Sequence, residues 1–286
     1  MNFLYRQFTS QSEIDAQYNA GASVPDYAAY LAGYQSSSAA TRESIPCALN
    51  LPYGPTRAET LDIFPAERPG APVLVFLHGG YWRALSAGDF SFVAQGPHQH
   101  GFTTVVVNYD LCPWVTIDEI VRQIRASLAW VYRHIGDHGG DPQRIVVSGH
   151  SAGGQLTAMS LLTPWADRYG LPDDLVKAAI PISGLYDLRP LRYSYLQPAL
   201  QLDDGLIARN SPLLLPPPRP LPVLVTWGDQ ESAEFARQSH AYAQALSDAG
   251  CQAALHASAG AHHFSVLDEF RQPASAICHW LSRIFT

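Results

Sequence analysis

The 286-residue sequence is 47% hydrophobic, and 18 Lys and Arg side chains against 25 Asp and Glu give a formal net charge of −7. A chain of this length and composition can bury a large core, so we expect residues 1–286 to form one domain. The negative charge argues against nucleic acid and anionic membranes as partners. No apolar run approaches the roughly 20 residues that span a bilayer, no signal peptide is apparent, and the four cysteines lack CxxC spacing, so we expect a cytoplasmic protein with reduced thiols.

Most of the chain alternates apolar segments of strand length with segments of helical periodicity. This alternation predicts an α/β fold with a mostly parallel central sheet flanked by helices. The first 45 residues do not fit the sheet and contain two helical stretches, residues 12–18 and 26–40. The predicted strands that follow are residues 60–64, 73–77, 103–108, 144–148, 178–182, 222–227 and 253–257. The predicted helices among them are residues 117–135, 155–162, 234–249 and 273–285.

The strand at residues 73–77 ends in His78-Gly79-Gly80-Tyr81-Trp82. Glycines at a strand end allow backbone N–H groups to reach a cleft without side chains in the way. We therefore expect the N–H groups of Gly80 and Tyr81, with Gly79 as a further candidate, to stabilise the oxyanion of a tetrahedral intermediate. Taken alone, the same segment also fits an ordinary glycine turn after a strand.

The strand at residues 144–148 leads into Gly149-His150-Ser151-Ala152-Gly153 and then into a helical segment. In this Gly-x-Ser-x-Gly pattern a tight turn holds the serine hydroxyl clear of the sheet, and the glycines occupy positions where a Cβ would collide with neighbouring chain. Ser151 is the candidate nucleophile, and the N–H of Ala152 would join the oxyanion donors.

An acid and then a histidine are expected further along the chain. The strand at residues 222–227 is followed by Gly228-Asp229-Gln230-Glu231. We favour Glu231 as the acid and keep Asp229 as the alternative, because an aspartate at such a position often caps a turn. One of the adjacent His262 and His263 should be the general base that takes the serine proton. A His-His pair is also a fragment of metal sites, but no third ligand stands at suitable spacing, so we expect no metal.

Together these motifs resemble the α/β-hydrolases of the arylformamidase, or kynurenine formamidase, group, near the hormone-sensitive-lipase-like esterases. The specific mark is His78-Gly79-Gly80-Tyr81-Trp82, where the broader esterase families usually carry a third glycine. Segments 108–111, 149–154, 183–188, 231–239 and 263–264 support the resemblance, which runs from about Tyr18 to the C-terminus. It implies Ser151 as nucleophile, His263 as base and Glu231 as acid. Relatives often have Asp at the acid position, which keeps Asp229 open.

The resemblance implies a serine hydrolase that cleaves a small acyl ester or amide through an acyl-enzyme, with a small molecule as substrate and no cofactor. N-formylkynurenine or a similar aryl formamide is the first choice, and a general small-acyl carboxylesterase is the alternative because a fold does not fix a substrate. A non-catalytic ligand-binding protein on the same fold is the remote alternative. The oligomeric state stays open, with a homodimer among the options.

The walls of the site carry two further expectations. In related esterases the N-terminal segment covers the site, so residues 18–34 either form a cap that limits substrate size or pack on the flank of the sheet. The aromatic rings of Tyr81 and Trp82 directly follow the oxyanion loop, and Tyr186 follows the strand that ends at residue 182. These three residues are candidates for contact with the substrate.

Overall fold

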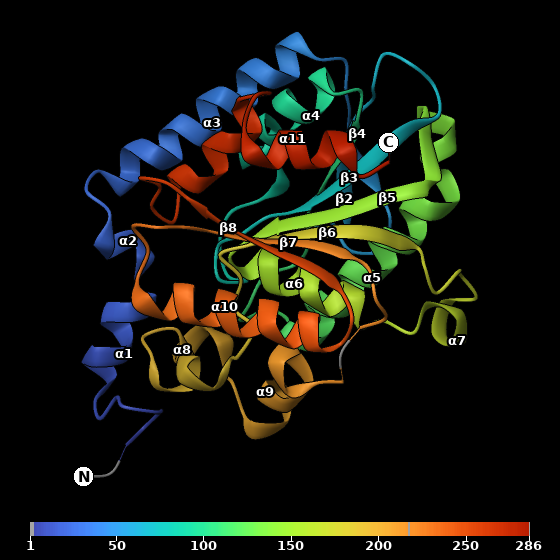
Figure 1. Ribbon diagram of the computed structural model, residues 1–286. Helices are drawn as coiled ribbons and strands as arrows, with labels where there is room; N and C mark the ends of the chain where they lie inside the picture. The colour runs from blue at the N-terminus through green and yellow to red at the C-terminus, as the bar shows by residue number, and fades with distance from the viewer. Residues whose placement is uncertain (1–2, 217, 286) are drawn as a thin grey trace.

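The computed structural model describes residues 3–216 and 218–285 and contains a twisted eight-stranded sheet between two layers of helices (Figure 1). The strand order is β1-β2-β4-β3-β5-β6-β7-β8. Strands β1 and β2 run antiparallel to their neighbours, and the pairs from β4 and β3 through to β8 are parallel. The predicted mostly parallel sheet flanked by helices is therefore confirmed.

All the predicted strands are present, with ends shifted by a few residues. They are β2 (Thr60–Phe64), β3 (Ala71–Leu77), β4 (Thr103–Val107), β5 (Gly140–His150), β6 (Val176–Ile182), β7 (Pro222–Gly228) and β8 (Gln252–Ser258). The sequence did not predict β1 (Ala48–Pro52). Its side chains are all exposed or half-buried, because it lies at the edge of the sheet, and it therefore lacks the apolar run that marks the buried strands.

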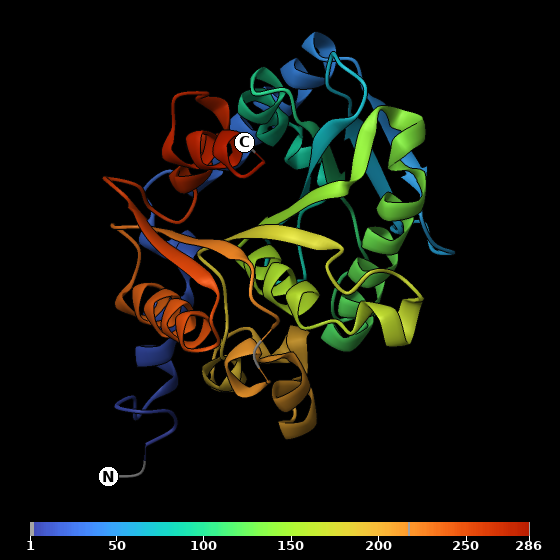
Figure 2. The same cartoon turned by 45° about the vertical axis from the view of Figure 1, so that its right-hand side comes forward.

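The helices cover both faces of the sheet. Those bordering the sheet or the site are α1 (Gln11–Tyr18), α2 (Ala20–Ser23), α3 (Tyr27–Ser44), α4 (Gln95–Gln99), α5 (Ile117–His134), α6 (Ala152–Leu161), α10 (Ala233–Asp248) and α11 (Ala276–Arg283). Shorter pieces are α7 (Trp165–Tyr169), α8 (Gln197–Leu200), α9 (Asp204–Asn210) and the 3₁₀ turns η1 (Ala87–Asp89), η2 (Ser91–Ala94), η3 (Ile135–His138), η4 (Arg189–Tyr193), η5 (Pro212–Leu214) and η6 (Ser265–Arg271). Helices α3, α4 and α11 lie on one face, and α5, α6 and α10 lie on the other (Figure 1), as the turned view also shows (Figure 2).

The last helix begins later than expected, at Ala276 rather than at residue 273. Ser275 caps it, since the Ser275 side chain accepts a hydrogen bond from the Cys278 N–H. A side-chain cap of this kind satisfies one of the free N–H groups of the first turn and so fixes the start of the helix.

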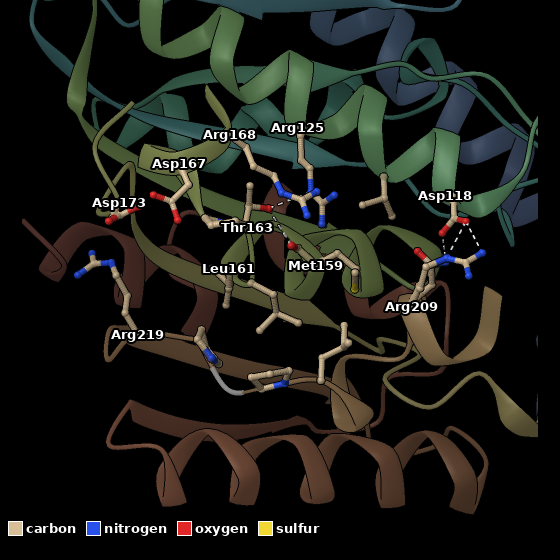
Figure 3. Close-up of a pocket in the computed structure, with 17 residues that line it drawn as sticks. Asp118, Arg125, Met159, Leu161, Thr163, Asp167, Arg168, Asp173, Arg209 and Arg219 are labelled. Atoms are coloured by element: carbon tan, nitrogen blue, oxygen red, sulfur yellow. Dashed lines mark hydrogen bonds and ion pairs between the residues drawn. The ribbon is translucent and has the colours of Figure 1, made fainter. Parts of the chain in front are cut away.

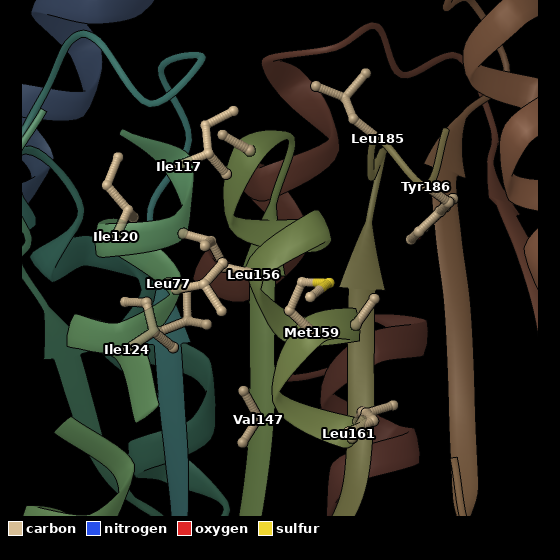
Figure 4. Close-up of a cluster of buried hydrophobic side chains, with 14 of the residues drawn as sticks. Leu77, Ile117, Ile120, Ile124, Val147, Leu156, Met159, Leu161, Leu185 and Tyr186 are labelled. Atoms are coloured by element: carbon tan, nitrogen blue, oxygen red, sulfur yellow. The ribbon is translucent and has the colours of Figure 1, made fainter. Parts of the chain in front are cut away.

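Apolar side chains fill both interfaces between the sheet and its helices. On one side, Ile117, Ile120 and Ile124 project from α5 toward Leu77 of β3 and Val147 of β5 (Figure 4). Their spacing of three and four residues gives α5 a single apolar face. The opposite face of the sheet is covered by an aromatic group that includes Phe76, Phe90, Phe92 and Phe270. The core therefore holds β3 and β5 rigidly, and both strands end at the site described below.

The N-terminal segment crosses from one face of the sheet to the other: α1 lies beside α10, α3 lies beside η1 and η2, and α2 connects them (Figure 1). Tyr18 anchors the α1 side, because its buried hydroxyl donates to Glu234 Oε2 (2.8 Å) and accepts from Gln238 Nε2 (2.9 Å). Tyr34 anchors the α3 side by donating to the carbonyl oxygen of Phe264 (2.5 Å). These buried polar contacts tie the segment to the C-terminal third of the chain.

Removing the Tyr18 hydroxyl is expected to loosen this attachment. In Tyr18→Phe the ring stays, but Glu234 and Gln238 each lose a buried hydrogen bond, which should lower the free energy of unfolding by about 1–3 kcal/mol. The matched control is Tyr193→Phe on a 37% exposed tyrosine, expected to change it by less than about 0.5 kcal/mol. Urea unfolding of both variants measures the difference, and equal stability would contradict the anchoring role.

Candidate active site

Ser151 lies in the tight turn between β5 and α6. Its backbone has φ 57° and ψ −115°, a conformation that costs energy in a residue with a Cβ and persists only where the surroundings impose it. The Ser151 N–H donates to the carbonyl oxygen of Ile182 (2.8 Å), which ties the turn to the end of β6. The side chain of Ser151 lines a pocket at this edge of the sheet.

Two glycines permit this turn by removing side chains from crowded backbone. A Cβ on Gly153 would lie 1.9 Å from the carbonyl oxygen of Leu77, at the end of β3. A Cβ on Gly149 would lie 2.2 Å from the carbonyl oxygen of Gly153. Backbone therefore packs directly on backbone here, and the start of α6 lies against the end of β3.

The loop after β3 passes directly beside Ser151, since a Cβ on Gly79 would lie 3.3 Å from the Cβ of Ser151. Gly80 has φ +111°, and its carbonyl oxygen accepts from the N–H groups of Arg83 and Ala84 (both 3.1 Å). In the part of the chain that the structure describes, no backbone group accepts from the N–H of Gly80, Tyr81 or Ala152. These donors are therefore available to an oxygen atom bound next to Ser151.

His78 fixes the start of this loop. Its ring is fully buried, stacked on Tyr109 (centroids 4.1 Å apart) and close to Phe90 (5.7 Å). Burial lowers the pKa of His78 to about 4, so the ring is neutral at physiological pH. Its Nδ1 lies 2.8 Å from the Gly79 carbonyl oxygen, an acceptor, so Nδ1 carries the proton and donates it there.

The loops after β7 and β8 place a carboxylate against an imidazole. Glu231 Oε2 lies 2.7 Å from Nδ1 of His263, and both side chains are buried. The other carboxylate oxygen accepts from the Ser183 hydroxyl (2.5 Å) and the Gly228 N–H (2.7 Å). With three donors Glu231 is held in one orientation, and it fixes the His263 tautomer so that Nε2 is the nitrogen free to accept a proton. Ser183, which the sequence did not single out, belongs to this arrangement.

The alternative acid, Asp229, and the alternative base, His262, lie outside this carboxylate–imidazole contact. Asp229 is exposed, and its Oδ1 accepts from the Gly260 N–H (2.8 Å) and from Gln230 Nε2 (3.0 Å). His262 faces α3, with its ring edge-on to Tyr30 (4.5 Å). Its Nδ1 accepts from the N–H groups of Phe264 and Ser265 (3.1 and 3.2 Å). Both residues therefore stabilise the loops around Glu231 and His263.

A pocket of about 190 Å³ opens above Ser151 and His263. The loop after β3 forms one wall, and Tyr195, after η4, contributes to another. The N-terminal segment supplies Asn19, Ala20, Gly21, Tyr27 and Tyr34. Residues 18–34 therefore contribute to the pocket wall, while α3 also packs on η1 and η2 beside the sheet. That the segment limits substrate size stays a prediction. A cavity of about 150 Å³ is known to hold benzene, so this pocket accommodates one aromatic ring and a small acyl group.

Of the three aromatic residues expected at the pocket, only Tyr81 lines it, and its hydroxyl donates to the Tyr18 carbonyl oxygen (2.5 Å). Trp82 is buried, with its indole N–H donating to Gln155 Oε1 (3.2 Å). The expected contact between Trp82 and the substrate is not supported: positive φ angles at Tyr81 and Trp82 turn the chain, and the indole reaches under the loop to α6. Tyr186 likewise is a core residue, stacked on Tyr242 (4.1 Å), and does not line the pocket.

His150 is a pocket residue that the sequence gave no reason to select. Its ring lies 4.6 Å from that of His263. Burial, and then the nearby His263, hold the pKa of His150 well below its usual range, so this ring is neutral at physiological pH. A neutral ring beside His263 adds no competing charge to the site.

A wider hollow of about 800 Å³ lies at the end of α6 away from Ser151 (Figure 3). Since α6 has 10 residues, its two ends are about 15 Å apart. Some of its charged side chains have partners within the protein: Arg209 forms an ion pair with Asp118 (2.7 Å), and Arg125 donates a hydrogen bond to Thr163 Oγ1 (3.1 Å). None of the residues discussed as nucleophile, base or acid lines it.

Within residues 3–216 and 218–285, no three His, Cys, Asp or Glu side chains are placed to share a metal ion. The helices in the same residues include none long and apolar enough to cross a membrane.

Comparison with known proteins agrees with this geometry. A family model described as alpha/beta hydrolase fold matches residues 74–267. The chain belongs to the α/β-hydrolase family, within its arylformamidase group.

The membership in this group follows from relatives that match most of the chain. A kynurenine formamidase of Salmo salar is 33% identical over 77% of this chain and 76% of its own length. One of Danio rerio is 29% identical over 91% of each chain. Among solved structures, a candidate thioesterase from Silicibacter sp. TM1040 has a TM-score of 0.83 and 30% identity, covering 94% of this chain and 99% of its own.

The contact between Gly153 and Leu77 can be tested by stability. Gly153→Ala puts a methyl group into the Leu77 carbonyl, which should lower the free energy of unfolding by about 1–3 kcal/mol or more. The control is Gly33→Ala in α3, where nothing lies within 4 Å of the added Cβ and alanine is expected to stabilise the helix by about 0.5–1 kcal/mol. Thermal or urea unfolding separates the two, and a harmless Gly153→Ala would contradict the close packing.

Proposed function

We propose that the chain is a serine hydrolase that removes a small acyl group, formyl above all, from an aromatic amine such as N-formylkynurenine. The observation that carries the proposal is that Ser151 and His263 both line a 190 Å³ pocket, with Glu231 bonded to Nδ1 of His263 (2.7 Å). The pocket walls include the rings of Tyr27, Phe90 and Phe264, which offer apolar faces to an aryl group.

In the first step Ser151 Oγ attacks the carbonyl carbon as His263 Nε2 takes the hydroxyl proton. Negative charge that develops on the carbonyl oxygen is stabilised by the N–H groups of Gly80, Tyr81 and Ala152, each worth roughly 3–4 kcal/mol in comparable sites. Glu231 stabilises the imidazolium that forms. The C–N bond then breaks, the amine nitrogen takes the proton from His263, and the acyl group stays on Ser151.

In the second step a water molecule gives its proton to His263 and attacks the acyl carbon. The tetrahedral intermediate collapses, Ser151 regains the proton, and the acid leaves. A formyl group suits this step because its carbonyl carbon bears only hydrogen beside the two oxygens of the ester. Water therefore approaches it with little hindrance in a narrow pocket.

The alternative is a general small-acyl carboxylesterase. The same three residues would act on an ester, whose intrinsic reactivity is higher than that of an amide, and the fold does not fix the substrate. The similar solved structure described as a candidate thioesterase also supports this alternative, because a thioesterase transfers an acyl group to water from a leaving group other than an amine. The pocket volume favours small acyl groups in either case.

The ratio of kcat/KM on N-formylkynurenine to that on p-nitrophenyl acetate separates the two functions. We expect the formamide to be the better substrate, and Ser151→Ala to lower both values by at least about 10⁴-fold because the covalent step is lost. Hydrolysis of the ester alone would make the chain a carboxylesterase. Activity that survives in Ser151→Ala would overturn the mechanism.

The role of Glu231 can be tested against the neighbouring carboxylate. Glu231→Gln replaces one of the acceptor oxygens by an NH₂ group that faces donors, so the His263 tautomer is no longer fixed and kcat should fall by about 10³–10⁴-fold. Asp229→Asn is the control and should keep kcat within a few fold, since the Asp229 side chain accepts from Gln230 and the Gly260 N–H, away from His263. If Asp229→Asn were the more damaging change, the assignment of the acid would be reversed.

A further inference from the structure

The pocket has a single permanent charge among its described lining residues, the guanidinium of Arg83. Arg83 is exposed and, with Ala84 and Tyr27, marks the side on which the pocket reaches the surface. No described carboxylate lies within ion-pair distance of it. By contrast, Arg122, Arg189 and Arg237 of this acidic chain each have a carboxylate partner at 2.6–2.7 Å.

The guanidinium of Arg83 lies at a defined place relative to the reacting atoms. The backbone N–H of Arg83 donates to the carbonyl oxygen of Gly80 (3.1 Å), so the residue is fixed to the loop that passes beside Ser151. Its guanidinium carbon lies 5.4 Å from the centroid of the Tyr195 ring, a cation–π contact that holds the side chain without using its five N–H donors. The donors therefore remain available to a ligand.

The neighbouring acid does not compete for these donors. Asp15 approaches the same wall, but its Oδ1 accepts from the Tyr195 N–H (2.7 Å) and its Oδ2 from Gln11 Nε2 (3.2 Å). A guanidinium with free donors at the mouth of a pocket without carboxylates favours an anionic ligand, and its planar fork matches a carboxylate.

We propose that Arg83 binds a carboxylate on the leaving-group side of the substrate, so that the protein selects acylated arylamines bearing a carboxylate over neutral ones. This rests on the proposed function, in which the acyl carbon lies at Ser151. One ring and a small acyl group fill the pocket, so any further chain on the leaving group extends to the mouth, where Arg83 lies.

The test compares two substrates that differ only in charge, N-formylkynurenine and its carboxamide. Arg83→Gln should lower kcat/KM on the carboxylate on the order of 10- to 100-fold, mainly through KM, because a charge-assisted bidentate contact is lost. The loss on the carboxamide should be several-fold smaller. Arg83→Lys keeps the charge and should recover part of the difference. Arg168→Gln, an exposed arginine at the hollow of Figure 3, is the control and should leave both values unchanged.

Equal losses of kcat/KM on the two substrates would mean that Arg83 acts through Tyr195 or the Gly80 loop. That result would overturn the proposal, and so would no loss on either substrate. Failure of the proposed function is recognised separately, as a wild-type protein that hydrolyses neither formamide. In that case 3-acetoxybenzoate and phenyl acetate form the charged and neutral pair. A loss in Arg83→Gln confined to 3-acetoxybenzoate would still support carboxylate binding by Arg83, and equal effects on the two esters would refute it.

Discussion

The site depends on one close approach, that of the first turn of α6 to the end of β3. Gly153 allows the helix backbone to touch the Leu77 carbonyl, where any side chain would keep the two apart. Because of this contact, the turn at Ser151 and the loop that begins at His78 lie side by side. Parallel strands end at the same edge of a sheet, so the loops after β7 and β8 bring Glu231 and His263 to the same place.

Burial and hydrogen bonding keep this edge electrostatically simple. Burial lowers the pKa of His78 and of His150, so both rings are neutral and neither adds a positive charge to this edge. The buried carboxylate of Glu231 is surrounded by donors from Ser183, Gly228 and His263. The site therefore combines a carboxyl group held by three donors with backbone N–H groups of Gly80, Tyr81 and Ala152 that have no backbone acceptor in the described residues.

The sequence predicted much of this because the local rules are strong. Buried strands are apolar runs, and tight backbone contacts require glycine, so β3, β5 and the turn at Ser151 could be recognised from their residues. The edge strand β1 was missed, because half-exposed residues carry no such pattern. Trp82 was expected at the pocket because it follows the loop after β3, but its position in the sequence does not give the direction of its side chain. Its positive φ angle sends the indole to Gln155 instead. Arg83 meets Tyr195, and Ser183 meets Glu231, across long stretches of sequence, so only the folded chain shows these contacts.

The attachment of the N-terminal segment has a consequence for how the molecule is made. Tyr34 bonds to Phe264, 230 residues away, and Tyr18 bonds to α10. During synthesis residues 18–34 leave the ribosome long before their docking partners exist. His263 is likewise synthesised well after Ser151. A partly synthesised chain that stops before His263 thus has Ser151 without the imidazole that shares its pocket. The pocket is complete only when residues 18–34 dock on the later part of the chain.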